Sequence, residues 1–292
     1  MFYDITLRIE YVYDHDADSS RHMVRLYPAD LPGKQRPVAA NMTVKPKPGE
    51  WINRFDYFGN NFIELAFTEA HHEIAFTVQS RVEMFETSPL FDMSPRLSEL
   101  GRDIAAQTRL EPWSPHNFVG PSPRVVLDEA TRRYAQEVVG GDPNALQAVR
   151  AIGTALHRDM RFDPEATTVD TPMLEAFHAR NGVCQDFTHI MISCLRGIGI
   201  PAGYVSGFLR TIPPPGQPRM EGADAMHAWV RAWCGSEIGW VEYDPTNAVA
   251  ANTDHVVIAR GRDYSDIAPV RGVMRSYGDH KTTQSVDVVP VE

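Results

Sequence analysis

The sequence predicts an α+β protein in which an N-terminal β-sandwich precedes a domain of helices followed by antiparallel strands. In the first ~90 residues, short runs mix β-branched, aromatic and polar residues with period-two alternation, and Pro, Gly and Asn separate the runs. Further along the chain, apolar residues recur at helical spacings of three and four, and strand-like runs follow only after them. Helices followed by a block of strands are typical of α+β domains.

Five strands are expected in the N-terminal part. Their number and close spacing favour two packed antiparallel sheets. Proline- and glycine-containing breaks separate several of them. The expected strands are 3–14, 22–28, 51–61, 61–69 and 73–85.

The composition changes near Ser88-Pro89, which divides the chain into three expected parts. Residues 1–90 form the β-rich domain, residues 91–123 are a proline-rich linker with one short helix near 96–108, and residues 124–292 form the second domain. Within that second domain the elements have a clear order. Helices are expected within 124–160 and at 173–180 and 184–198, and strands at 203–210, 227–234 and 240–246.

Composition limits the partners and the location. The chain has 292 residues, 43% apolar content and a formal net charge of −10, which argues against nucleic acid or an anionic membrane as the main partner. No run approaches ~18 uninterrupted apolar residues, and the start lacks the pattern of a secretory signal. The three cysteines form no disulfide-like pattern, so we expect free thiols in a reducing cytoplasm.

Cys184 is the candidate nucleophile. It follows an Asn-Gly turn signal and opens a helix whose apolar residues continue along one face. The free N–H groups and the positive end of the dipole in the first turn favour a thiolate there. Cys194, in the middle of the apolar face, fits the more common role of a free cysteine as a small buried apolar side chain.

His227 and Asp244 are the candidate base and its orienting acid. His227 lies on a strand that ends near Cys234, and Gly235–Gly239 closes a hairpin to a return strand that ends at Asp244-Pro245. If residue 234 pairs with 239, paired positions add up to 473, and Asp244 falls diagonally across from His227 on the same face. A shift of one residue would place the two side chains on opposite faces. The triad therefore predicts this register or one shifted by two residues.

Five motifs in order give the chain a clear resemblance. They are NGVCQDFTH at 181–189, RGIGIPAGYVSGF at 196–208, DAMHAWV at 224–230, DPTN at 244–247 and GRDYSD at 261–266. Together they resemble the bacterial transglutaminase-like proteins, and the N-terminal part, including DYFGN at 56–60, resembles the β-rich domain that accompanies that core. The resemblance implies a papain-like core with Cys184, His227 and Asp244 as a catalytic triad. It departs from the family pattern at Thr188 and Met226, where Ala and Ser are usual.

We expect additional side chains in the substrate cleft. Trp229 shares a strand face with His227, and the polar and aromatic run Arg262, Asp263 and Tyr264 is unusual among strands. The backbone N–H of Cys184 is expected to form part of an oxyanion hole with a second donor that the sequence does not identify. No metal site and no cofactor are expected, because covalent acyl transfer requires neither.

The expected function is thiol-dependent acyl transfer on amide bonds of a peptide or protein substrate through a thioester, with hydrolysis favoured because the resemblance is to members described as cysteine peptidases. Three alternatives stay open: a protein-glutamine amine transferase, an arylamine acetyltransferase, and a non-catalytic binding protein that keeps the fold. The N-terminal domain and the DPTN and GRDY runs argue against the acetyltransferase. The sequence does not identify the physiological substrate or the oligomeric state.

Overall fold

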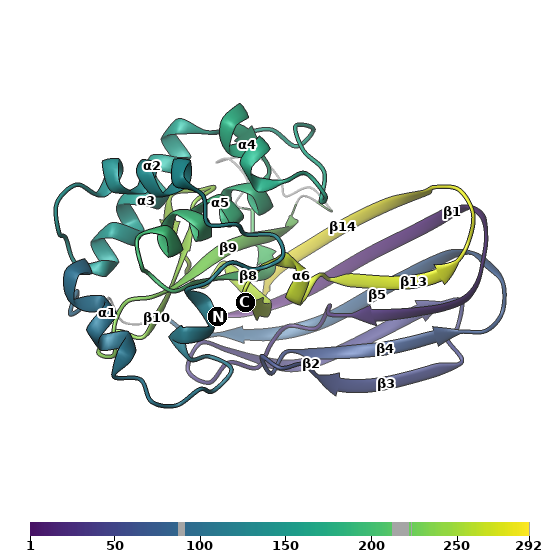
Figure 1. The fold of residues 1–292 in the computed structure, drawn as a ribbon. Helices are drawn as coiled ribbons and strands as arrows, with labels where there is room; N and C mark the ends of the chain where they lie inside the picture. Colours follow the sequence, from purple (N-terminus) through teal and green to yellow (C-terminus); the bar gives the residue numbers. More distant parts are fainter. Residues whose placement is uncertain (87–90, 212–221, 223, 292) are drawn as a thin grey trace, which may run out of the picture.

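The computed structural model describes residues 1–86, 91–211, 222 and 224–291. It confirms the predicted α+β class, with one large antiparallel sheet, a second five-stranded sheet and a group of helices (Figure 1). Among the described residues, no helix is both long enough and apolar enough to cross a bilayer.

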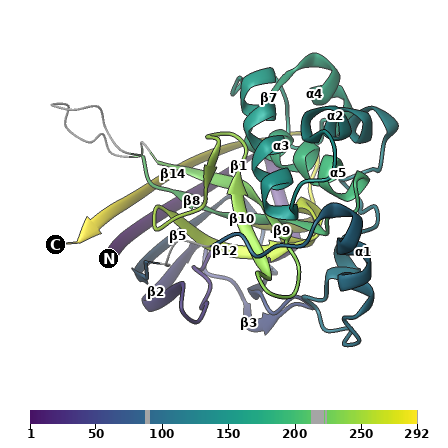
Figure 2. The same ribbon diagram turned by 90° about the vertical axis from the view of Figure 1, so that its left-hand side faces the viewer.

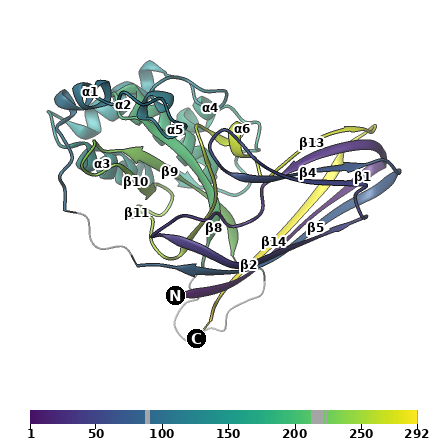
Figure 3. The same cartoon turned by 90° about the horizontal axis from the view of Figure 1, so that it is seen from below.

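The N-terminal half is a curled sheet organised around one long strand, β1. Its two ends pair with different neighbours: Phe2–Tyr13 with β14 and β5, and Asp18–Val24 with β13 and β4. Register breaks after Val12 separate these two pairings, so the strands spread into two layers, as Figure 3 shows. Alternate residues of β1 are buried, so one face of each layer packs inward. The bounds are β1 Phe2–Val24, β2 Gln35–Lys45, β3 Glu50–Phe55, β4 Asn61–Phe67, β5 His71–Met84, β13 Val270–Arg275 and β14 His280–Val291.

Two of the strand predictions in this half were wrong. Residues 22–28 are not a separate strand, because β1 continues through them to Val24. The strand β2 was not predicted because most of its side chains are exposed, which leaves little apolar alternation to detect. The strand expected at 51–61 ends earlier, at Phe55, because Asp56 accepts hydrogen bonds from the backbone of residues 58 and 60 and closes a turn.

The second half is a five-stranded antiparallel sheet in the order β11-β10-β9-β8-β12. Helices α3 and α5 contact one face of it, with α2 packed against both (Figure 2). The predicted hairpin register is confirmed: Trp240 pairs with Trp233 and Tyr243 with Val230, positions that add up to 473. The strands are β8 Ala202–Leu209, β9 Ala225–Trp233, β10 Trp240–Asp244, β11 Val249–Ala250 and β12 His255–Gly261, and a short pair joins β6 Arg161–Phe162 to β7 Asn181–Gly182.

The helices lie close to their predicted positions. The predicted helical stretch 124–160 contains two helices, separated where Gly140 and Gly141 adopt positive φ angles. The helices are α1 Leu97–Ala105, α2 Glu129–Val139, α3 Ala145–Asp159, α4 Met173–Ala179, α5 Cys184–Gly197 and α6 Tyr264–Ile267, with a 3₁₀ turn η1 at Pro115–Phe118.

The two halves are joined closely. The loop between β1 and β2 covers the sheet face opposite the helices, where Ala29 donates to the Val257 carbonyl at 2.9 Å and Gln35 bonds both backbone groups of Val257 at 2.8 Å. The strands β13 and β14 return from the second half to pair with β1. The predicted boundary at residue 90, like the composition change at Ser88-Pro89, lies outside the described residues, and the three-part division stays a prediction.

Candidate active site

Cys184 is the first residue of α5 and is half-buried. The carboxylate of Asp186 fixes the start of this helix, since it accepts the Val183 backbone N–H at 2.9 Å and the Thr167 hydroxyl at 2.5 Å. Gly182 is needed just before it, because a Cβ there would lie 2.6 Å from the same carboxylate. Asp186 therefore acts as a structural hydrogen-bonding residue at the start of α5.

Packing holds this helix start in place. The apolar side chains of α5, including Phe187 and Ile190, are fully buried. Burial of each such side chain contributes roughly 1.5–3 kcal/mol to the stability of the fold. Thr188, where the family usually has Ala, donates its hydroxyl to the carbonyl of Cys184 at 2.7 Å. This hydrogen bond runs back along the helix, so the Thr188 hydroxyl contacts the backbone of Cys184 rather than its thiol.

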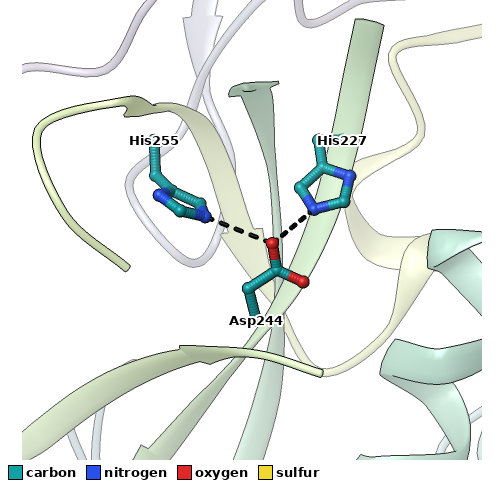
Figure 4. Close-up of side chains that lie close together, drawn as sticks. All are labelled: His227, Asp244 and His255. Carbon is teal, nitrogen blue, oxygen red and sulfur yellow. Dashed lines mark hydrogen bonds and ion pairs between the residues drawn. The ribbon is translucent and has the colours of Figure 1, made fainter. Parts of the chain in front are cut away.

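His227 and Asp244 come together across the β9–β10 hairpin. The distance from His227 Nε2 to Asp244 Oδ2 is 2.8 Å, and both side chains are buried (Figure 4). Since Nε2 faces the carboxylate, Nδ1 is the ring nitrogen that remains for Cys184. Burial alone would lower the pKa of His227, but the hydrogen bonds with Asp244 and Cys184 outweigh it and raise the pKa to about 10. The structure thus places Cys184, His227 and Asp244 in one connected arrangement.

Asp244 is held as an anion by a dense set of donors. Its Oδ2 faces His227 Nε2, His255 Nε2 at 3.3 Å and the side-chain amide of Asn247 at 2.7 Å. Its Oδ1 accepts the backbone N–H groups of Thr246 at 2.9 Å and Asn247 at 3.2 Å. Burial would raise the pKa of Asp244, but these hydrogen bonds, with that of His227 the largest, keep the pKa well below its usual range.

Comparison with known proteins identifies the family of this chain. Residues 132–245 match the transglutaminase-like superfamily, and residues 3–83 match the bacterial transglutaminase-like N-terminal region. Uncharacterized proteins from Mycobacterium bovis and Mycobacterium tuberculosis are 34% identical over 297 residues, covering 99% of this chain and 93% of theirs. The chain belongs to the transglutaminase-like superfamily.

A solved structure supports the same fold for the whole chain. It comes from Cytophaga hutchinsonii and is provisionally named a cysteine protease. The TM-score is 0.74 at 22% sequence identity, over 100% of this chain and 91% of that one. At this level of identity the likeness establishes the shared fold of both halves, including the curled N-terminal sheet.

His255 is a site residue that the sequence did not reveal. It opens β12, which is separated from β10 by β9 and β8 in the sheet, and it lies beyond the segment matched to the transglutaminase-like superfamily. No local pattern connects it to Asp244, because only the order of the strands brings the two together. Asn247 belongs to the DPTN motif, so a signal for it was present, but its hydrogen bonds to Asp244 depend on the turn after β10.

His227, Asp244 and His255 also form a possible metal-ligand set. Each offers one ligand atom, and these atoms lie within 4.8 Å of one another (Figure 4). Two imidazoles and one carboxylate suit a divalent transition metal. In this arrangement both Nε2 atoms face a carboxylate oxygen, which accepts hydrogen bonds but cannot donate them, so each Nε2 carries a proton. A metal would have to displace both protons, and the proposed mechanism below uses none.

The four predicted cleft residues lie in different surroundings. Trp229 is fully buried behind His227, with the two rings stacked at 6.2 Å, and it donates its indole N–H to Glu242 at 2.8 Å. Asp263 is buried and accepts the backbone N–H groups of Arg124 at 2.7 Å and Ser265 at 2.8 Å. Both side chains support neighbouring structure in this arrangement.

Arg262 and Tyr264 point to separate regions. Arg262 forms an ion pair with Asp266 at 2.9 Å and lines a pocket of about 310 Å³. The Tyr264 ring meets Tyr204 edge-on at 6.2 Å, and Cys184 lies close enough to Tyr204 to contribute to the raised pKa of that buried phenol. Of these two residues, Tyr264 is the one connected to the surroundings of the thiol.

The other two cysteines differ from Cys184. Cys194 and Cys234 are fully buried, and burial raises the pKa of each thiol to about 12. All three cysteines are free. Free thiols fit a reducing compartment, and a cytoplasmic location stays a prediction.

Proposed function

We propose that this transglutaminase-like protein is a thiol-dependent acyl-transfer enzyme that cleaves amide bonds in a peptide or protein substrate. The observation that carries the proposal is the position of His227, which bonds Asp244 through Nε2 at 2.8 Å and lies close enough to Cys184 for that residue to help raise its pKa. A nucleophilic cysteine needs a neighbouring base that a third group orients, and these three residues meet that requirement.

The first half-reaction forms a thioester. The sulfur of the Cys184 thiolate attacks the carbonyl carbon of the amide, and the C–N bond breaks as His227 gives its Nδ1 proton to the leaving amine. Asp244 keeps Nε2 protonated and the ring in place throughout. The backbone N–H of Cys184, at the start of α5, stabilises the negative oxygen of the tetrahedral intermediate together with a second donor.

The second half-reaction releases the acyl group. Neutral His227 takes a proton at Nδ1 from water, the resulting hydroxide adds to the thioester carbon, and the C–S bond breaks to give a carboxylic acid and the thiolate. An amine in place of water would give a new amide, which is the transglutaminase outcome. We favour water, in keeping with the resemblance to cysteine peptidases, and one experiment measures both outcomes.

The test compares wild type with Cys184→Ala on a peptide library and on glutamine peptides offered with a primary amine. Cys234→Ala is the matched control, because it removes a thiol that is fully buried. We expect products with the wild type and the control, and none with Cys184→Ala. Equal products from Cys184→Ala would remove the thiol from the mechanism, and no product from any variant would favour a binding protein that keeps the fold.

A further inference from the structure

A second group of charged side chains lies where the N-terminal half meets the core sheet. Lys34 comes from the loop between β1 and β2, Arg231 from β9, Glu242 from β10 and Arg260 from β12. All four line a pocket of about 700 Å³. This volume falls within the range of roughly 300–1,000 Å³ that is usual for small-molecule sites. The pocket lining contains none of Cys184, His227 and Asp244.

The charges in this group do not balance. Glu242 is its carboxylate, and both oxygens are already used: Oε1 accepts Arg260 Nη2 at 2.5 Å, while Oε2 accepts Lys34 Nζ and the Trp229 indole N–H. The side chains of Glu242, Arg260 and Lys34 are only 7%, 14% and 23% exposed. Three cations therefore surround one carboxylate with little access to solvent. The exposed rim adds Arg150 and Glu86, whose charges cancel.

Two of the guanidinium groups have unused donors. Arg231 Nη1 and Arg260 Nε are buried and have no hydrogen-bond partner within the described part of the chain. Arg231 packs against Trp113 and Trp240, with its guanidinium carbon 4.6 Å from the centre of each ring. Contact with aromatic rings holds a guanidinium in place and leaves its in-plane N–H groups free to reach an acceptor.

Burial and the neighbouring charges both act on Arg231. Burial and, to a smaller extent, the positive charge of Arg260 lower the pKa of Arg231 to about 9, while Glu242 acts in the opposite direction. Buried charges without a partner are costly, so an anion in the pocket would offset the repulsion among these cations.

We propose that this pocket binds a small oxyanion, a carboxylate or a phosphate group, with the in-plane donors of Arg231 and Arg260 contacting its oxygens. Planar guanidinium groups match both kinds of oxyanion, and Trp113 and Trp240 hold Arg231 in a fixed orientation. The site is additional to the proposed acyl-transfer site and does not depend on it.

The test uses the full chain with inorganic phosphate in one series and citrate in another, at constant ionic strength balanced with sodium chloride. Intrinsic tryptophan fluorescence is the first readout, because Trp113 and Trp240 contact Arg231 directly. The shift in the unfolding temperature is the second, because a ligand that binds only the folded state raises it. We expect saturable binding of at least one anion, and binding about tenfold weaker in Arg231→Met.

Two further variants make the test decisive. Arg133→Met removes an exposed arginine of α2 and is expected to bind like wild type. Ala250→Trp fills the pocket from its exposed edge without removing a charge, so it keeps the proposal testable if Arg231→Met does not fold. We expect it to abolish binding.

The outcomes distinguish anion binding from a purely structural role of the cations, and they also identify the kind of anion. Tighter binding of citrate would assign the pocket to carboxylates, and tighter binding of phosphate would assign it to phosphoryl groups. If sodium chloride gives the same response, or if Arg231→Met and Ala250→Trp bind like wild type, the proposal is wrong and the cations serve only an ion-pair network between the two halves.

Discussion

His255 places its Nε2 3.3 Å from Asp244 Oδ2, the same oxygen that lies 2.8 Å from His227 Nε2. Because a carboxylate only accepts, both imidazoles donate to it. The other ring nitrogen of His255, Nδ1, lies 3.3 Å from the backbone nitrogen and 3.2 Å from the side-chain oxygen of Asn252. His255 is thus held on both sides, and in turn it limits how Asp244 can rotate.

The first prediction concerns His255 as a positioning residue. We expect His255→Ala to lower kcat about tenfold with little change in KM, since it removes one hydrogen bond to a buried charge. His255→Gln should restore most of the rate, because its amide N–H can donate to Asp244. His178→Ala, in an exposed position of α4, is the control. If His255→Gln and His255→Ala are equally impaired although both variants fold, His255 does not act by donating a hydrogen bond to Asp244.

Asp244→Asn should be far more damaging. An amide in place of the carboxylate can donate to Nε2 and favour the wrong tautomer of His227, so we expect kcat to fall by about three to four orders of magnitude. Circular dichroism would check the fold, and Asp170→Asn, a largely exposed carboxylate, is the matched control. A loss below about tenfold would argue against Asp244 as the residue that orients the base.

The raised pKa of His227 predicts a pH-dependent contribution to stability. The pKa is about 10 in the folded protein and ~6.5 in an unfolded chain. Protonated His227 therefore stabilises the fold fully below pH ~6.5, and this contribution is lost as the pH rises through about 10. The difference in Tm between wild type and His227→Gln should shrink across this window. A Tm difference that stays constant from pH 6 to pH 10 would contradict the assignment of a proton to His227 in the folded protein.

Thiol alkylation should distinguish the three cysteines. At mildly acidic pH we expect iodoacetamide to modify Cys184 at least about tenfold faster than Cys194 or Cys234, because Cys184 is half-buried beside an imidazolium and the others are fully buried. Mass spectrometry of tryptic peptides measures each rate. His227→Gln should slow the alkylation of Cys184 but not that of Cys194 or Cys234. Equal alkylation rates for all three thiols would exclude an activated thiolate.

Gly153 in α3 links packing to the site. A Cβ at this position would lie 2.1 Å from the ring of Tyr243, the residue before Asp244, so Gly153→Ala must displace that ring. We expect a loss of about 1–3 kcal/mol in the free energy of unfolding, measured with urea, together with reduced activity. Gly101→Ala in α1, whose added Cβ meets no atom of the described residues within 4 Å, is the control and should be neutral or slightly stabilising.

The sequence was most informative where the determining contacts are local. The start of α5 follows from a turn signal and helical spacing, and the β9–β10 register follows from the short connection 235–239, so the relation of His227 to Asp244 could be predicted. His255 could not, because two strands separate β12 from β10. Arg231 pairs with Glu242 in the same hairpin, but the position of Lys34 beside Glu242 depends on how the two halves meet, which no local pattern encodes.

The pairing of β1 with β14 has a consequence for how the chain is made. Phe2 is paired with Val291, so β1 is synthesised long before β14, the strand that pairs with it. The segment from Cys184 to Asp244 is synthesised before that strand exists. Contacts between residues so far apart in sequence form slowly, and an incomplete sheet exposes an unpaired strand edge. We therefore expect chains that stop before residue 280 to aggregate, even though every residue of the proposed triad is present in them.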